Sequence, residues 1–207
     1  MIVLILPLFM ACPPQQQIYP CTCTIDQIFC SGLENDQVLS DVVYALKMRM
    51  RKLYSFTIKN SHFMYIPHDI FTNVVFPEFQ ITDSSFMALT DTDVAFEGLE
   101  EHMASLVITD SDMLNAWDWM VLKNLKKLLK LHIDVDLSIV SKDIQQLTSV
   151  NLRDISLAKN KITYVYENAF ANFKELLSLS LRSNLITEIK RSMFPDPAPL
   201  LWKLDLG

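Results

Sequence analysis

The chain has 207 residues and a formal charge of −6, with 18 Lys and Arg residues against 24 Asp and Glu residues. Half of its residues are hydrophobic, which is enough to build the core of one domain or one repetitive solenoid. The acidic balance argues against nucleic acid as a partner, because phosphate binding needs clustered Lys and Arg.

The chain begins with an apolar run, MIVLILPLFMA, over residues 1–11. This run is too short to span a membrane and has the length of the apolar part of a secretory signal peptide. A signal peptide is therefore the favoured interpretation, although the usual positive charge before the run is missing. The alternatives are a buried strand or a bacterial lipoprotein junction with a lipidated Cys12. No later segment is apolar enough to cross a bilayer.

All four cysteines follow directly, at Cys12, Cys21, Cys23 and Cys30. An even number of cysteines clustered after a signal-like run predicts two disulfides in an oxidising compartment. Zinc binding is the alternative, but the C-x-C spacing chelates a metal less well than C-x2-C. Three pairings are possible, and each cysteine of the C-x-C pair is expected to bond elsewhere, because their side chains point oppositely in an extended chain.

The segment 36–50, DQVLSDVVYALKMRM, has the apolar spacing of an amphipathic helix. Its apolar residues fall at helical intervals from Leu39 to Met50. We expect this helix to cover the end of the core beside the cysteines. Residues 12–52 would then form a cysteine-rich N-terminal cap.

From residue 53 to the end, one pattern of spaced apolar residues recurs. Its clearest copies are LRDISLAKNKITYV at 152–165 and LLSLSLRSNLITEI at 176–189. Two earlier copies share nearly identical hexamers, ITDSSF at 81–86 and ITDSDM at 108–113. Seven copies keep phase, the fourth is degenerate, and the chain stops inside the seventh. The copies begin at residues 53, 76, 103, 128, 152, 176 and 201.

This spacing is that of leucine-rich repeats, in which each copy contributes a short strand and buries its apolar side against neighbouring copies. The sequence thus predicts an α/β right-handed solenoid, or horseshoe, over residues 53–207, with a parallel sheet on its concave face. One polar column is expected to bond backbone groups in the adjoining loops. Its members are Ser61, Ser84, Ser111, Asp136, Asn160 and Asn184. A second column, largely of aromatic rings, is expected in the core beneath the outer, convex side of the solenoid. Its members are Phe71, Phe96, Leu147, Phe170 and Phe194.

Two segments allow a sharper interpretation than a repeat. Residues 115–130 look amphipathic and basic, as in a membrane-binding or calmodulin-target helix, but the repeat phase favours the convex part of the third copy. The acidic run at 91–97 resembles a calcium loop only loosely, because the Gly bend and the distal Glu are not in place. We interpret it as a solvated outer turn.

The cysteines in CPPQQQIYPCTC and IFC, followed by the seven copies, resemble the extracellular leucine-rich repeat proteins with an N-terminal cysteine cap. The resemblance implies a secreted, non-enzymatic protein and the disulfides Cys12–Cys23 and Cys21–Cys30. The opening around IYPCTC and the phrase FPEFQITDSSF resemble more closely an arthropod branch of this family. That branch includes the non-catalytic subunit of the Oplophorus-luciferin 2-monooxygenase.

No residue pattern points to an enzyme, a cofactor or a metal. The four histidines lack ligand spacing, and the zinc, nucleophile-elbow and phosphate-loop motifs are absent. The remaining candidate is the concave face, where side chains between the inward residues meet solvent and where solenoids commonly bind partners. Acidic candidates fall nearer the cap, and basic candidates nearer the C-terminus. They are Asp83, Asp110, Asp134, Arg153, Lys159, Arg182, Trp202 and Lys203, with Glu78 beside them.

We therefore expect a secreted protein that binds another protein through its concave face. Two alternatives remain open: a non-catalytic accessory subunit of a secreted oxidase or luciferase-like complex, and an ectodomain fragment of a leucine-rich repeat receptor. The receptor alternative, and any membrane attachment, would require a span beyond Gly207.

Overall fold

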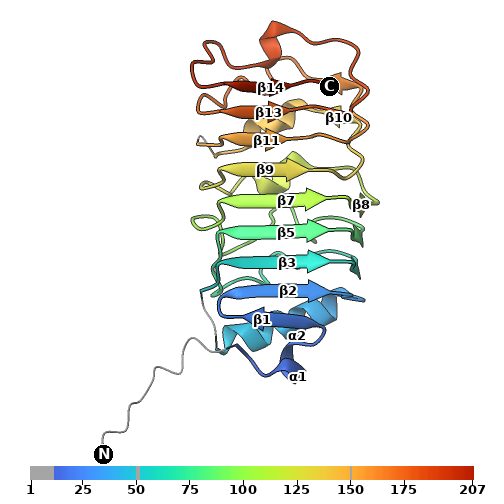
Figure 1. Ribbon diagram of the computed structural model, residues 1–207, viewed down its shortest axis with the longest axis vertical. Helices are drawn as coiled ribbons and strands as arrows, with labels where there is room; N and C mark the ends of the chain where they lie inside the picture. The colour runs from blue at the N-terminus through green and yellow to red at the C-terminus, as the bar shows by residue number, and fades with distance from the viewer. Residues whose placement is uncertain (1–11, 50–51, 150) are drawn as a thin grey trace, which may run out of the picture.

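The computed structural model describes residues 12–49, 52–149 and 151–207. The signal peptide expected at residues 1–11 lies outside these residues. The described chain winds into a stack of coils, with the cysteine-rich segment at one end and the C-terminus at the other (Figure 1). The predicted solenoid is therefore confirmed.

A nine-stranded sheet runs along the whole stack, in the order β1-β2-β3-β5-β7-β9-β11-β13-β14. Only the first pair, β1 with β2, is antiparallel, and every later neighbour is parallel. The strands are β1 (Cys21–Thr24), β2 (Gln27–Ser31), β3 (Ser55–Lys59), β5 (Glu78–Thr82), β7 (Ser105–Thr109), β9 (Lys130–Ile133), β11 (Asp154–Ser156), β13 (Ser178–Ser180) and β14 (Lys203–Asp205).

From β2 to β13 each strand alternates between the core and solvent, as the period of two in a strand requires. In β3, Phe56 and Ile58 are buried while the residues between and beside them face outward. Behind the sheet, Phe71 packs against Phe56, Phe76 and Phe79 with ring centroids 5.0–5.6 Å apart. Each coil alone could not bury these rings, so the stacking of coils creates the core.

The predicted column on the outer side is present as two stacked ring pairs joined by aliphatic residues. Phe71 stacks on Phe96 at 6.3 Å, and Phe170 on Phe194 at 6.4 Å. Leu122 and Leu147 are buried at the corresponding places in the coils between them.

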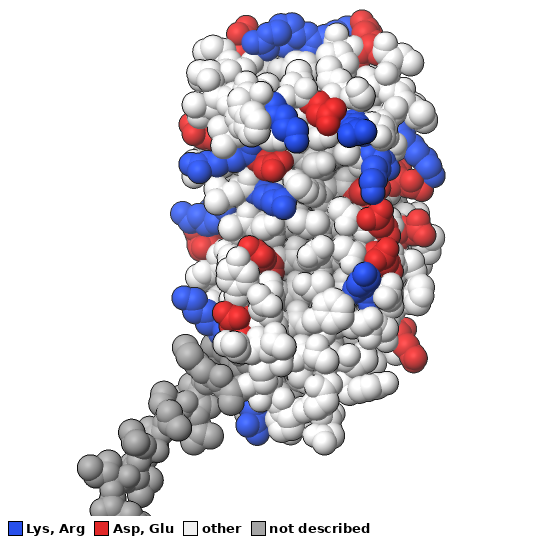
Figure 2. Space-filling model, viewed as in Figure 1, with Lys and Arg blue, Asp and Glu red and all other residues white. Residues whose placement is uncertain are grey.

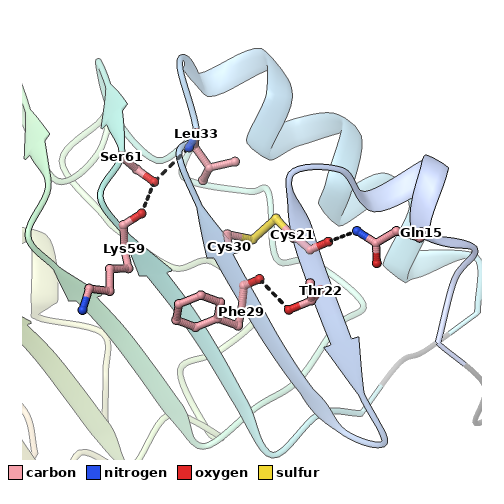
Figure 3. The surroundings of a disulfide bond; sticks show 8 residues. All are labelled: Gln15, Cys21, Thr22, Phe29, Cys30, Leu33, Lys59 and Ser61. Carbon is pink, nitrogen blue, oxygen red and sulfur yellow. Dashed lines mark hydrogen bonds between the residues drawn. A yellow bond between two sulfur atoms is a disulfide. The ribbon is translucent and has the colours of Figure 1, made fainter.

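The cap consists of α1 (Gln15–Ile18), the β1–β2 hairpin and α2 (Asp36–Lys47). Its disulfides are Cys12–Cys23 and Cys21–Cys30, the pairing that the family resemblance implies. Cys21–Cys30 crosses the hairpin, and Gln15 donates to the Cys21 carbonyl at 2.7 Å (Figure 3). Leu33 N–H donates to Ser61 Oγ at 3.0 Å and so connects the cap to the first coil.

Helix α2 confirms the amphipathic segment predicted at 36–50, with Leu39, Val42, Val43 and Leu46 buried. It begins where the Asn35 side chain accepts a hydrogen bond from the Val38 N–H, a typical N-cap. Its last residue is Lys47, and Met50 of the predicted segment lies outside the described residues.

The outer side of the solenoid carries only short 3₁₀ helices, η1 (Trp119–Leu122), η2 (Lys142–Gln146) and η3 (Arg191–Met193). Residues 115–130 thus form no α-helix and consist of η1, turns and irregular chain before β9, and the buried Leu125 and Leu128 place this segment in the core-facing path of its coil. In the acidic segment at 91–97, the Asp91 carboxylate accepts a hydrogen bond from the His68 N–H at 2.8 Å. Among the described residues, no helix is long and apolar enough to cross a membrane.

A second, narrower ladder follows the sheet where each strand turns away, and it changes character along the stack. In the first three coils it is β4 (His62–Phe63), β6 (Ser85–Phe86) and β8 (Asp112–Met113). In the fourth and fifth coils it is β10 (Ile139–Val140) and β12 (Tyr164–Val165), which lie later in their repeats.

The polar column explains the change. Ser84 and Ser111 accept hydrogen bonds from Ser61 N–H and Ser84 N–H, each at 3.2 Å, which draws consecutive coils together directly. The longer Asn160 instead accepts from Val135 N–H and Leu137 N–H and donates to Ile133 O.

Asp136 does not belong to this column, and that part of the prediction was wrong. Its carboxylate is exposed and pairs with Lys161 Nζ at 2.5 Å. The physical reason is that an ionised carboxylate accepts hydrogen bonds but cannot donate to backbone carbonyls, as the Asn160 amide does. The side-chain amide of Asn160, in the next coil, bonds the backbone around Asp136 instead.

Candidate functional site: the outward face of the sheet

The outward face of the nine-stranded sheet is the surface that the sequence singles out for binding. Pairing in register aligns the outward side chains of successive strands into columns that run along the stack. The central column faces solvent from the hairpin to the last strand. Its members are Phe29, Thr57, Gln80, Val107, His132, Ser156, Ser180 and Asp205.

The central column carries no Asp, Glu, Lys or Arg before Asp205. On the same face, charged side chains gather toward the two ends of the strands and leave a mostly uncharged strip between them (Figure 2). The strip also holds an exposed aromatic ring, Phe29, near the cap. An uncharged centre with a charged border is the usual anatomy of a protein–protein interface.

At the carboxyl ends of the strands, the structure brings three of the predicted residues together. Asp110 pairs with Lys159 Nζ at 3.3 Å, across two coils. Asp134 Oδ2 accepts a hydrogen bond from the Asp110 N–H at 3.4 Å. Burial of its carboxylate raises the pKa of Asp134 above its usual value.

These three residues line a hollow of about 180 Å³ in the face, together with Thr109, His132 and Ser156. His132 Nε2 lies 3.2 Å from Asp154 Oδ1 of the next coil. Burial lowers the pKa of His132, and the nearby Asp154 opposes part of that shift. The hollow therefore places the His132 imidazole beside a carboxylate and an ion pair.

The other predicted residues stand apart. Asp83 pairs with Lys59 at 3.3 Å, and Arg182 is exposed beyond the end of β13. Arg153, Trp202 and Lys203 lie at the opposite, amino ends of their strands. The eight residues thus border the face on two sides and do not form one cluster.

The expected separation into an acidic end and a basic end needs correction. Lys59 neutralises Asp83 in the early coils, and Asp154 and Asp205 stand among the basic residues of the later coils. The charges alternate along the borders because each coil places its ionic residues beside those of its neighbours.

Sequence reasoning missed three residues of this face: Lys59, His132 and Tyr54. Tyr54 Oη donates to the Glu78 carboxylate at 3.0 Å, and this bond raises the pKa of Tyr54. The signal for Lys59 and His132 was in the pattern, because both hold outward strand positions of copies that had been aligned.

The described residues contain no group of three or more His, Cys, Asp or Glu side chains that could hold a metal ion. The pairs His132–Asp154 and Asp110–Lys159, in and beside the hollow, are exposed or half-buried.

No protein-family model and no curated protein sequence matches this chain. Among solved structures, it is similar to a leucine-rich repeat protein of Leptospira interrogans, with a TM-score of 0.56 and 16% sequence identity. The match covers 81% of this chain and 50% of that protein, so this chain spans half of its length. At this identity the similarity shows the fold alone, a leucine-rich repeat solenoid. The disulfide-bonded cap is seen in the structure of this chain itself.

Proposed function

We propose that this chain is a secreted binding protein without enzymatic activity, and that its partner is a protein lying against the outward face of the sheet. One observation carries the proposal: from β2 to β13 the central column of the sheet faces solvent without a charged side chain, between two charged borders. Secretion is supported by the two disulfides, which persist in oxidising compartments. The apolar run at residues 1–11 adds the sequence pattern of a signal peptide.

The face is large enough for this role. Its strands are spaced about 4.8 Å apart, so nine of them extend about 40 Å along the stack. Specific interfaces of about 800 Å² per partner fit easily on such a surface. The charged borders would select the partner and set its orientation, because rim charges contribute more to specificity than to affinity.

A site-specific cross-linker tests which face binds. Gln80 lies in the central column, and Gln146 lies in η2 on the outer side, and both side chains are exposed. A photoreactive residue in place of Gln80 should capture a protein from the medium of the producing cells, whereas the same residue in place of Gln146 should capture none. Equal capture at both positions would contradict the proposal.

Substitution at the border then tests specificity. Arg182→Glu together with Lys203→Glu reverses two exposed charges without touching the core. We expect the captured yield at Gln80 to fall about tenfold, because like charges at a rim are repulsive. An unchanged yield would remove these two residues from the proposed interface.

The accessory-subunit hypothesis rests on the resemblance of IYPCTC and FPEFQITDSSF alone. It predicts that the chain co-purifies with a separate catalytic chain. A partner captured at Gln80 that lacks oxidase activity would count against it and leave the binding function intact.

A further inference from the structure

A row of exposed apolar side chains runs along the narrow edge ladder, away from the outward face of the sheet. Met64, Met87, Leu114 and Ile139 hold the same position in four successive coils and are 49%, 38%, 76% and 51% exposed. We call these four residues the edge stripe. Met87 N–H donates to the Met64 carbonyl at 3.0 Å, and Leu114 N–H to the Phe86 carbonyl at 3.0 Å, so the first three members are adjacent in space. Leu114 and Ile139 line the same hollow.

Two hollows flank the edge stripe. The first, of about 250 Å³, is lined by Met64, Met87 and Leu114 with the buried rings Phe63 and Phe86 as its floor. The second, of about 430 Å³, is lined by Leu114 and Ile139 with Met113, Trp117 and Trp119. Leu114 belongs to both, so the stripe connects a mainly apolar first hollow to a second one that is also lined by the polar residues Asn115, Ser138 and Ser141.

The charged side chains that line the two hollows are all acidic. Glu34 and Asp36 line the first hollow, and Asp136 lines the second. Neither hollow is lined by a Lys or Arg, although Lys161 pairs with Asp136 beside the second. Asp112 is exposed between the two hollows. A partner that fits this surface is apolar on its contact side and basic beside it.

The spacing of the stripe selects the shape of the partner. Successive coils place one apolar side chain about every 4.8 Å. An α-helix presents one side chain per turn about every 5.4 Å along a face, whereas alternate residues of a strand are about 6.7 Å apart. A helix lying along the solenoid axis therefore stays in step over four coils, and an extended peptide does not.

We propose that the edge stripe binds an amphipathic helix of about three turns, with apolar residues at i, i+4, i+7 and i+11 and Lys or Arg beside them. The apolar residues insert between the members of the stripe and into its two hollows. The basic residues meet Glu34, Asp36 and Asp112. This site is separate from the outward face and does not depend on the function proposed for that face.

Three synthetic peptides of 15 residues test the proposal by fluorescence anisotropy on the full chain. The first has Leu at the four helical positions with Lys beside them, the second has Glu in place of Lys, and the third has the composition of the first with Leu at alternate positions. We expect the first to bind at least about tenfold more tightly than either of the others. Its affinity should fall as salt rises. Equal binding of all three, or preference for the second or third, would overturn the proposal.

Exposed-residue variants localise the site. Met87→Lys with Leu114→Lys should weaken binding of the first peptide at least about tenfold. Ile25→Lys, at an exposed apolar residue in the hairpin turn of the cap, should not weaken it.

Footprinting keeps the test valid if the double variant fails to fold. In the unmodified chain, the first peptide should slow peroxide oxidation of Met64 and Met87 and leave that of Met48 unchanged. Protection of none of these, or of Met48 alone, would overturn the proposal. So would a self-associated chain that dissociates in the double variant, because a second copy would then be the occupant.

Discussion

At the scale of single residues, Asn160 makes the largest local contribution to the described polar column. Its side-chain oxygen accepts from Val135 N–H at 3.1 Å and Leu137 N–H at 2.9 Å, and its amide donates to Ile133 O and Leu157 O. The side chain is buried, so the backbone groups that it satisfies have no water to replace it. One amide thereby fixes the turns of two coils.

Replacement of Asn160 by Ala should therefore cost about 3 kcal/mol in the free energy of unfolding, because several buried backbone groups lose their partner. Asn184→Ala is the matched control, since Asn184 makes the same kind of bonds to Ile162, Leu157 and Leu181 but is half-buried. Asn184→Ala should therefore lower the free energy of unfolding by less than Asn160→Ala. Urea denaturation of both variants measures the difference, and a loss below about 1 kcal/mol at Asn160 would contradict the argument.

Asp134 is the residue whose charge opposes folding. Burial raises its pKa above the ordinary value of 3.8. The folded chain then holds this proton more tightly than the unfolded chain, so its contribution to stability is present at low pH and is lost as pH rises through the raised pKa. Asp134→Asn keeps an oxygen that can accept from Asp110 N–H and removes the charge.

We expect Asp134→Asn to raise Tm by about 1–2 °C at pH 7 and to leave it unchanged at pH 3, where Asp134 is protonated. Thermal unfolding followed by circular dichroism across this range gives the result. Asp83→Asn is the control, because Asp83 is exposed and pairs with Lys59. A gain at pH 7 that persists undiminished at pH 3 would show that the charge of Asp134 is not the cause.

At the scale of elements, the apolar spacing was sufficient to predict one strand in each copy and α2, because burial on one side imposes the period of each element. It did not predict the β1–β2 hairpin of the cap. The fourth coil departed from the prediction because its column position carries Asp136, which cannot replace an amide. The side-chain pairs of the outward face, such as His132 with Asp154, depend on the register between coils. The spacing within one copy does not fix that register for polar residues at the borders.

The two disulfides of the cap close loops of similar length, with sequence separations of 11 and 9 residues. Chain entropy alone therefore predicts nearly equal stabilisation, about 2–4 kcal/mol each. They differ in burial, since Cys21 and Cys30 are fully buried in the core whereas Cys12 and Cys23 are half-buried. Packing should make the inner disulfide the more important one.

We expect Cys21→Ala with Cys30→Ala to destabilise the chain more than Cys12→Ala with Cys23→Ala, by about 1–2 kcal/mol. Denaturant unfolding without reductant compares the two variants. If the outer pair proves the more costly to remove, then loop closure or strand pairing, and not core packing, governs the stability of the cap.

At the scale of the whole molecule, the solenoid is continuous on its sheet and divided on its edge. β7 and β9 pair normally, and Asp134 N–H donates to Ile108 O at 2.7 Å. Beyond that point, no backbone hydrogen bond joins residues 135–141 to residues 111–118, two segments that the structure describes in full. We call this gap in the edge ladder, between residues 111–118 and 135–141, the seam. The second hollow lies at the seam, and the buried Trp117 Nε1 beside it has no hydrogen-bond partner among the described residues. The early coils, which Ser84 and Ser111 connect, and the later coils, which Asn160 and Asn184 connect, thus meet without a shared edge ladder.

A coil stack is stabilised mainly by contacts between neighbours, so a weak contact lowers the local free energy of opening without unfolding the rest. Hydrogen exchange measures this directly. Ser85, Met87 and Ala88 N–H donate to the preceding coil, whereas residues 138–141 make no such bonds to theirs. Peptides covering 138–141 should therefore exchange at least about tenfold faster than peptides covering 85–88. Equal protection would mean that side-chain packing across the seam replaces the missing ladder, and the solenoid would then behave as one cooperative unit from the cap to β14.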